Sequence, residues 1–354
     1  MKRAIFHAIM WTIAALPILL VASLLFVSGF AYDILRHPER HENANGFRIW
    51  NYVASGLYFT REANIWQNKK ECVEFDEVLL YKPSLGCSFV NREFSTQLTF
   101  SEDGRAGDNE RKSPSNQAIL LAGDSFTMGW GVNDNETFGR LIASQINVPV
   151  FNLGVSSYGT VREIMRVRMH PRFRDANCII IQYYWNDLEE NQTFLTLGAL
   201  PTPTRARFEQ LFDYKPRKQT FLAVMQTTQE YIWRQPSAFF ADLLGLRNFP
   251  ESLWLINGQL GTSSEHADVF IDVVRRFPEL NDKIIFVFGP NDFVDALALR
   301  NTLEYVLPLR IEIPYDGFNV LDIHLNKKGH QAIATRILEE LRKNEKGRQC
   351  LYSR

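Results

Sequence analysis

Five residues have the types that acyl transfer through a serine requires. This chemistry needs a nucleophile, a base that takes its proton, a group that orients the base, and hydrogen-bond donors for the oxyanion. Ser125 is the candidate nucleophile and His324 the candidate base, since an unperturbed imidazole titrates at about pH 6.5. Asp322, two residues before the histidine, is the candidate orienter. The candidate oxyanion donors are the backbone N–H groups of Ser125 and Gly154 and the side-chain amide of Asn186.

The expected position of Ser125 follows from the apolar run before it. Residues 118–122 read AILLA and end at Gly123, which predicts a buried parallel strand. Ser125 then lies at the carboxyl end of that strand, where open α/β sheets hold their ligands. The same residues also fit an ordinary serine at the start of a helix. The motifs that follow the later strands favour the catalytic interpretation.

Strand and helix patterns alternate along most of the chain. Strands are predicted at 118–122, 148–153, 178–184 and 283–288, and helices at about 137–146, 160–170, 266–277, 293–305 and 328–343. This alternation predicts an α/β fold with a parallel sheet covered on both faces. Right-handed crossovers bring the carboxyl ends of the strands to one edge.

The N-terminus carries a membrane-spanning pattern. An uncharged run over 4–32 follows Lys2 and Arg3, and it is long enough to cross a hydrocarbon core of about 30 Å. The preceding positive charges favour a cytoplasmic N-terminus and a single-pass protein with its bulk outside the cytoplasm. A cleaved signal peptide ending near Gly29 and Ala31 is the competing interpretation.

Composition argues against one class of partner. The net charge of −1 leaves no basic excess to neutralise phosphates, so no nucleic-acid partner is expected. The four cysteines form no Cys-x-x-Cys pair, so no structural zinc site is expected. Cys178, inside an apolar run, is predicted to be a buried free thiol. Cys72 and Cys87 form a disulfide or remain unpaired; both alternatives are open.

These patterns divide the chain into four parts. We expect a cytoplasmic N-terminus and anchor at 1–35, an extension at 36–117, a catalytic domain at 118–346 and a C-terminal tail at 347–354. The extension is expected to form short strands and turns, with a loop at 103–105. An aromatic-rich insert at about 194–262 is either a lid or acyl pocket, or a helical insert that packs on the domain.

The motifs GDSFTMGWGV, FNLGVSSYGT and HLNKKGH resemble the membrane-anchored or secreted bacterial branch of the SGNH (GDSL) hydrolase superfamily. The resemblance covers roughly 118–341. It implies a three-layer α/β/α sandwich of flavodoxin-like type, with Ser125, Gly154, Asn186 and His324 as the four named residues. It implies no metal or organic cofactor.

The chain departs from the family pattern at two places. The family's Asp three residues before the histidine is Leu321 here, so Asp322 is the best candidate and a Ser–His dyad is the alternative. The Gly two residues before Asn186 is Tyr184. A second match, Gly289-Pro290-Asn291-Asp292, follows the fourth strand, whereas the family's block follows the third, so we prefer Asn186.

Three functions fit these residues. The first is an extracytoplasmic serine esterase that removes an acyl group, an O-acetyl group above all, from a glycan or lipid. The second is an O-acyltransferase that passes the acyl group to a cell-envelope or extracellular polysaccharide. The third is an inactive glycan-binding module on the same fold. Outside the five candidates, Asp124 is expected to set the turn before Ser125, Asp187 to cap a helix, and His330 to be structural.

Overall fold

The structure is a computed structural model that describes residues 2–41, 49–101, 104–105, 117–244, 261–314 and 316–352. The chain forms two compact units. The first combines Met1–Ala63, Lys215–Ser252 and Val320–Ile323, and the second combines Asn64–Tyr214, Leu253–Asn319 and His324–Arg354. The predicted extension is therefore divided, because residues up to Ala63 belong with the N-terminal helix and those from Asn64 belong with the sheet.

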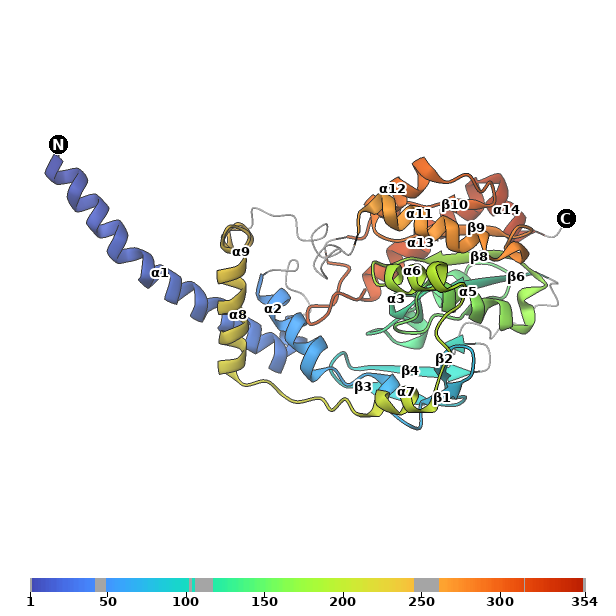
Figure 1. Ribbon diagram of the computed structural model, residues 1–354, viewed down its shortest axis with the longest axis horizontal. Coiled ribbons are helices and arrows are strands. Elements are labelled where there is room, and N and C mark those ends of the chain that lie inside the picture. Colours follow the sequence, from blue (N-terminus) through green and yellow to red (C-terminus); the bar gives the residue numbers. More distant parts are fainter. Residues whose placement is uncertain are drawn as a thin grey trace. The chain divides into compact units, whose positions relative to one another are not determined.

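The second unit is built on a five-stranded parallel sheet (Figure 1). Its strands are β6 (Ala118–Ala122), β7 (Val150–Asn152), β8 (Ala176–Gln182), β9 (Ile284–Phe288) and β10 (Val306–Pro308). Their order is β10-β9-β8-β6-β7, and every neighbouring pair is parallel. Numbered along the chain this is 2-1-3-4-5, the order of one group of doubly wound sheets. The α/β prediction is confirmed.

The helices around the sheet fall into two groups. Helices α4 (Phe138–Ala143), α13 (Lys327–Lys343) and α14 (Glu345–Leu351) pack together, as do α5 (Thr160–Met169), α6 (Asp187–Leu197), α11 (Ser263–Arg275) and α12 (Asn291–Arg300). When crossovers are right-handed, the direction in which a connection crosses the sheet decides which face its helix covers. The connection from β6 to β7 runs in one direction and the later connections run in the other, so the two groups of helices lie on opposite faces.

The four predicted strands are confirmed, and the fifth was missed. The helix predicted over 293–305 ends at Arg300, and β10 follows at Val306. This edge strand has only three residues, too few to show a strand period against the end of a helix.

The reversal of strand order matters for the site. β6 lies between β7 and β8, with Leu121 opposite Asn152 and Ala122 opposite Ile181. The segments that leave the carboxyl ends of these three strands are therefore neighbours. In open α/β sheets such a switch point is the usual ligand site.

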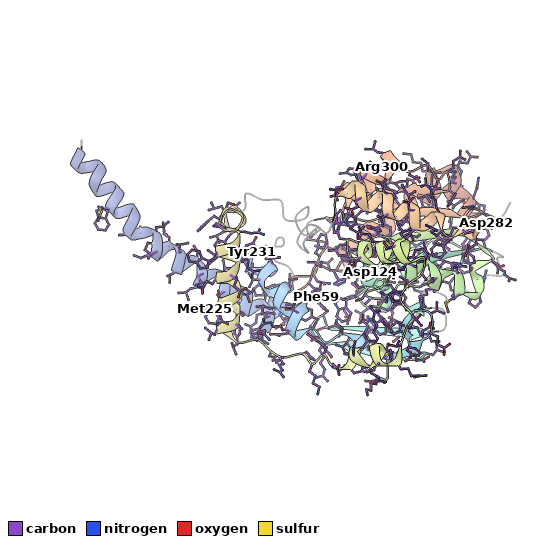
Figure 2. The ribbon with its side chains drawn as sticks, in the orientation of Figure 1. Phe59, Asp124, Met225, Tyr231, Asp282 and Arg300 are labelled. Atoms are coloured by element: carbon purple, nitrogen blue, oxygen red, sulfur yellow. A yellow bond between two sulfur atoms is a disulfide. The ribbon has the colours of Figure 1, made fainter. Side chains whose placement is uncertain are left out.

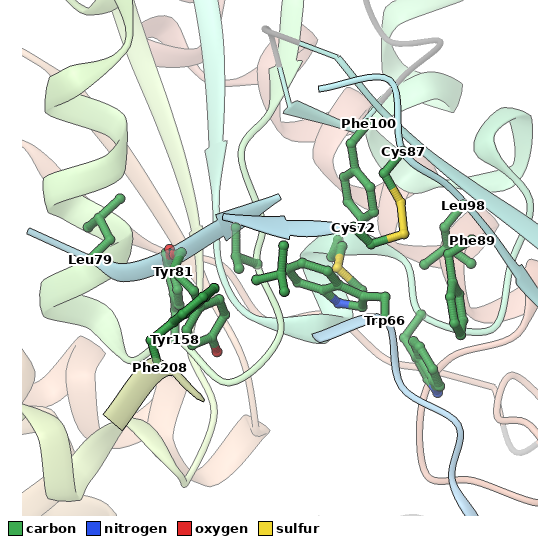
Figure 3. Close-up of a cluster of buried hydrophobic side chains, with 14 residues drawn as sticks. Trp66, Cys72, Leu79, Tyr81, Cys87, Phe89, Leu98, Phe100, Tyr158 and Phe208 are labelled. Carbon is green, nitrogen blue, oxygen red and sulfur yellow. A yellow bond between two sulfur atoms is a disulfide. The ribbon is translucent and has the colours of Figure 1, made fainter. Parts of the chain in front are cut away.

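Residues 64–105 form the short strands expected of the extension. β1 (Val73–Asp76) pairs antiparallel with β2 (Leu80–Pro83), and β4 (Thr96–Ser101) lies between β3 (Ser88–Asn91) and β5 (Gly104–Arg105). The loop prediction for 103–105 is wrong at Gly104 and Arg105, which pair with β4; Asp103 lies outside the described residues. The segment 64–105 as a whole, strands and turns together, contributes most of a buried cluster around Trp66, which also contains Met128, Trp130, Val155 and Tyr158 (Figure 3).

Two disulfides connect distant parts of the second unit. Cys72 and Cys87 are paired, with their Cα atoms 4.9 Å apart, which decides the alternative left open above. Cys178 of β8 is paired with Cys350 of α14, with a Cα–Cα distance of 5.5 Å. The free-thiol prediction for Cys178 is therefore wrong. Residues of the predicted tail up to Leu351 are helical and are bonded covalently to the sheet.

The first unit is helical. It contains α1 (Lys2–Arg36), α2 (Ile49–Leu57), the π-helical turn η2 (Tyr58–Glu62), α8 (Phe221–Arg234) and α9 (Pro236–Leu243), and α8 packs on α1, α2 and α9. Within α1, Ala14–Arg36 is long and apolar enough to cross a membrane. The part of the predicted insert that holds α8 and α9 thus belongs to this unit, whereas α7 (Arg205–Glu209) belongs with the sheet, and residues 245–260 of the insert lie outside the described residues.

Candidate active site

Ser125 is the first residue of α3 (Ser125–Met128), directly beyond β6. The carboxylate of Asp124 caps this short helix by accepting a hydrogen bond of 2.9 Å from the N–H of Phe126, so the predicted turn-setting role is confirmed. Gly123 has φ +152°, and a Cβ there would collide with the side chain of Thr127. Ser125 is partly exposed while its neighbours in sequence are buried, so the hydroxyl is accessible.

The structure brings the predicted nucleophile and base together. Nε2 of His324 lies 2.6 Å from Oγ of Ser125, although the residues are 199 positions apart. The backbone around the histidine is closed by a hydrogen bond of 2.8 Å from the N–H of Asn319 to the carbonyl of His324. Asn326 caps α13 by accepting from the N–H groups of Lys328 and Gly329. The distance of 2.6 Å between Nε2 of His324 and Oγ of Ser125 suits proton transfer from the hydroxyl to the imidazole.

Two aromatic rings flank the imidazole. The ring centroid of His324 lies 4.7 Å from that of Phe126 and 6.4 Å from that of Trp130. His324 is only 6% exposed. The rings restrict the imidazole to a narrow range of orientations. Both belong to the quoted GDSFTMGW motif, but nothing in the spacing indicated that they contact the base.

A buried arginine fixes the end of α3. Arg105 of β5 donates hydrogen bonds to the carbonyl oxygens of Met128, Gly129 and Val132, at 2.6, 2.9 and 2.8 Å. Its guanidinium also pairs with Asp134. Sequence reasoning missed this residue because a lone arginine before the first core strand has no distinguishing local pattern.

Gly154 packs against the nucleophile helix. A Cβ at this position would collide with the backbone N of Met128 and lie 2.8 Å from the carbonyl carbon of Thr127. Asn152 links the same segments, since its amide donates to the carbonyl of Thr127 at 2.8 Å and its Oδ1 accepts from the N–H of Gly154 at 3.1 Å. The structure thus places Gly154 beside α3, with its N–H engaged by Asn152.

Asn186 follows β8 and holds the N-cap position of α6. It is exposed, and its side-chain amide lowers the pKa of Asp124, the residue before the candidate nucleophile. The prediction that Asp187 caps this helix is therefore wrong, because Asp187 is the first residue of the helix. The carboxyl group of Asp187 accepts a hydrogen bond of 2.9 Å from the hydroxyl of Thr160. The alternative asparagine, Asn291, begins α12 beyond β9, a strand that does not neighbour β6.

Asp322 is fully buried in the segment Val320–Ile323, which belongs to the first unit. Its role as the orienter of His324 stays a prediction.

Three carboxyl groups are buried behind the nucleophile. Burial raises the pKa of Asp124 to about 6, partly opposed by its hydrogen bond from Phe126 and by the charge of His324. Burial, and then the charge of Asp187, raise the pKa of Glu163 well above its ordinary value. Burial, and then the charge of Asp124, raise the pKa of Asp187 in the same way.

His330 has the structural role predicted for it. It is 1% exposed, its ring stacks on Phe138, and its Nδ1 accepts a hydrogen bond of 3.2 Å from the N–H of that residue. Burial lowers the pKa of His330 to about 3, so the ring is neutral at neutral pH.

A cavity of about 450 Å³ opens beside Asn186. One wall is the turn between β1 and β2, and another is the start of α6 with Glu189, Glu190 and Thr193. The segment from Leu200 to Arg207 forms part of the rim. Residues 200–207 of the predicted insert therefore contribute to a pocket, and the role of the insert as a lid or acyl pocket stays a prediction.

The chain was also compared with known proteins. No protein-family model matches it, and no curated protein matches it in sequence.

Proposed function

We propose that this protein is an extracytoplasmic serine esterase of the SGNH (GDSL) type, with the three-layer sandwich of that superfamily, that acts on an acyl ester of a glycan or lipid. The observation that carries the proposal is the 2.6 Å contact between Oγ of Ser125 and Nε2 of His324 at the switch point of the sheet. The cavity is lined by Asn186, the proposed oxyanion donor, whereas Ser125 and His324 are not among its lining residues.

The first half-reaction forms an acyl-enzyme. The hydroxyl of Ser125 donates its hydrogen bond to Nε2 of His324, which takes the proton as Oγ attacks the ester carbonyl. The N–H of Ser125 and the amide of Asn186 stabilise the resulting oxyanion, with Gly154 as a third donor once its bond to Asn152 yields. The intermediate collapses, and the imidazolium returns the proton to the leaving alcohol.

The second half-reaction releases the acyl group. A water attacks the acyl carbonyl while His324 takes its proton, and the carboxylic acid leaves as the proton returns to Oγ of Ser125. Asp322 is the proposed orienter of the imidazole in both steps. If a sugar hydroxyl replaces the water, the same residues carry out O-acyl transfer, which is the alternative activity.

Three features support a location outside the cytoplasm. α1 contains a stretch that can span a bilayer, Lys2 and Arg3 precede it, and the chain has two disulfides. Disulfides persist in oxidising compartments, and positive flanks stay on the cytoplasmic side.

The test uses the full chain in detergent micelles, with 4-nitrophenyl acetate as substrate and a fluorophosphonate as probe of the nucleophile. We expect turnover and labelling that both disappear in Ser125→Ala and persist in Ser144→Ala, an exposed serine at the end of α4. Labelling that survives Ser125→Ala would refute the assignment, and no turnover by the unaltered chain would favour a binding module. Adding an acetylated-sugar donor and a polysaccharide acceptor, and analysing the products, separates transfer from hydrolysis.

A further inference from the structure

Helices α8 and α9 of the first unit expose large apolar side chains. Leu222 and Trp233 on α8 are 62% and 74% exposed, and Leu244, which follows α9, is 69% exposed. On α8 these positions continue through Met225 and Gln229, so that residues 222, 225, 229 and 233 form one uncharged stripe. Figure 2 labels Met225 on this helix. The neighbouring face, with Val224, Thr228 and Ile232, is buried.

The exposure of α1 changes along its length. Leu16, Leu19, Val21, Leu25 and Phe26 are about half exposed or more, whereas Val27, Ala31, Ile34 and Leu35 are buried. A hydrocarbon core of about 30 Å takes about 20 helical residues, and α1 has 35. Part of α1 therefore extends beyond the core, and we take this part to be the last turns because their side chains are buried by protein; α8 packs on α1 and α2. In Figure 1, α8 runs across the axis of α1.

An aromatic cluster lies where the exposed part of α1 ends. The ring of Trp50 on α2 is 5.9 Å from that of Phe26 and 5.1 Å from that of Phe30. Phe26 and Phe30 are 50% and 39% exposed. Tryptophan and other aromatic side chains favour the boundary between lipid and water.

The exposed charges of this unit are mostly positive. Its exposed basic residues near α8 are Arg61, Lys215, Arg217, Lys218 and Arg234. Within the part of the chain that the structure describes, none of these five side chains has an ion-pair partner. The exposed acidic residue of α8 is Glu230. Such an excess of cations beside apolar side chains suits a surface of anionic lipid headgroups.

We propose that α8 and α9 lie in the membrane interface, with the stripe of Leu222 and Trp233 inserted among the lipids of the leaflet from which α1 emerges. The bilayer is the occupant of this apolar face because α8 packs on α1, which contains a stretch able to span a membrane, and because exposed cations lie near α8. The anchor then consists of the spanning helix α1 and the interfacial helices α8 and α9. The two kinds of membrane contact together restrict the tilt of this unit relative to the membrane.

The test measures depth in the bilayer by spin labelling. The full chain carries one added cysteine at a time, Leu222→Cys, Trp233→Cys or Leu244→Cys, and is placed in nanodiscs of phosphatidylcholine and phosphatidylglycerol. The four native cysteines are paired in disulfides, so a nitroxide reagent labels the added one. Collision of the nitroxide with oxygen, which partitions into lipid, is compared with collision with a water-soluble nickel chelate. Leu299→Cys is the matched control, an 88% exposed leucine on α12 in the other unit.

We expect an oxygen-to-nickel collision ratio severalfold higher at residues 222, 233 and 244 than at residue 299. Equal ratios would place α8 and α9 in water and overturn the proposal. Protection from both reagents would mean that protein covers the face, which also overturns it. A label at Leu16→Cys tests the span of α1 separately, and a water-like ratio there would remove the basis of the proposal. None of these outcomes depends on whether the protein is an esterase.

Discussion

Asp124→Asn tests how the site holds a buried carboxyl group beside its nucleophile. Asp124 is 3% exposed, and burial raises its pKa from 3.8 to about 6. One pH unit of pKa is worth about 1.4 kcal/mol, so the difference between 3.8 and about 6 corresponds to about 3 kcal/mol. Asparagine keeps an oxygen that can accept from the N–H of Phe126, so the cap of α3 is retained.

The sign of the effect follows from linkage. Because the folded-state pKa is raised, folding favours the protonated acid, and this stabilisation is complete below about pH 3.8 and lost as the pH rises through about 6. The asparagine variant has no such loss. Its free energy of unfolding, minus that of the unaltered protein, should therefore rise by about 3 kcal/mol between about pH 3.5 and pH 7.5. Removing the charge of Asp124 also lowers the pKa of Asp187 in the folded variant. The variant then loses less stability from Asp187 as the pH rises, and this adds to the expected rise in the difference.

The assay is urea unfolding of the full chain in detergent micelles, followed by tryptophan fluorescence at a series of pH values. Asp213→Asn is the control, because this exposed aspartate is in the same unit and its replacement should leave the difference flat. A flat difference for Asp124→Asn would mean that the carboxyl group is solvated in the folded protein. A difference that falls with pH would show that the folded state favours the ionised form, which refutes the reasoning from burial.

Three further predictions concern the same unit. Gly154→Ala should slow fluorophosphonate labelling of the nucleophile and destabilise the protein by about 1–3 kcal/mol, because the added methyl collides with the backbone of Met128; unchanged labelling would contradict the close packing. Asn186→Ala should lower kcat for 4-nitrophenyl acetate by about 10²- to 10³-fold as an oxyanion donor is lost, and an unchanged kcat would remove it from that role. Replacing Cys178 and Cys350 with alanine should lower the free energy of unfolding by roughly 2–4 kcal/mol, measured by the same urea titration, and free thiols in the unaltered denatured chain would disprove the bond.

Local pattern predicted the parts of this protein that depend on neighbours in sequence. The run AILLA at 118–122 matches β6 at both ends, and the cap formed by Asp124 lies within two residues of the atom that it binds. The errors occur where the deciding partner is remote. Cys178 was predicted to be a free thiol because its disulfide partner is 172 residues away in the sequence. Gly104 and Arg105 were predicted to be loop because a strand of two residues is too short to show an alternating pattern. Arg105 had no local signal at all, although it anchors the end of α3.

The sequence by itself determined the alternation of strands and helices, the apolar N-terminal stretch and the residue types available for serine chemistry, since each is written in spacing and composition. Only the tertiary structure decided that Ser125 and His324 meet at 2.6 Å, that burial leaves Asp124 with a raised pKa, and that the predicted extension and insert are each divided between two units. These properties depend on strand order and on what surrounds each side chain. Both are set by packing among segments that are far apart in the chain, and no local pattern records them.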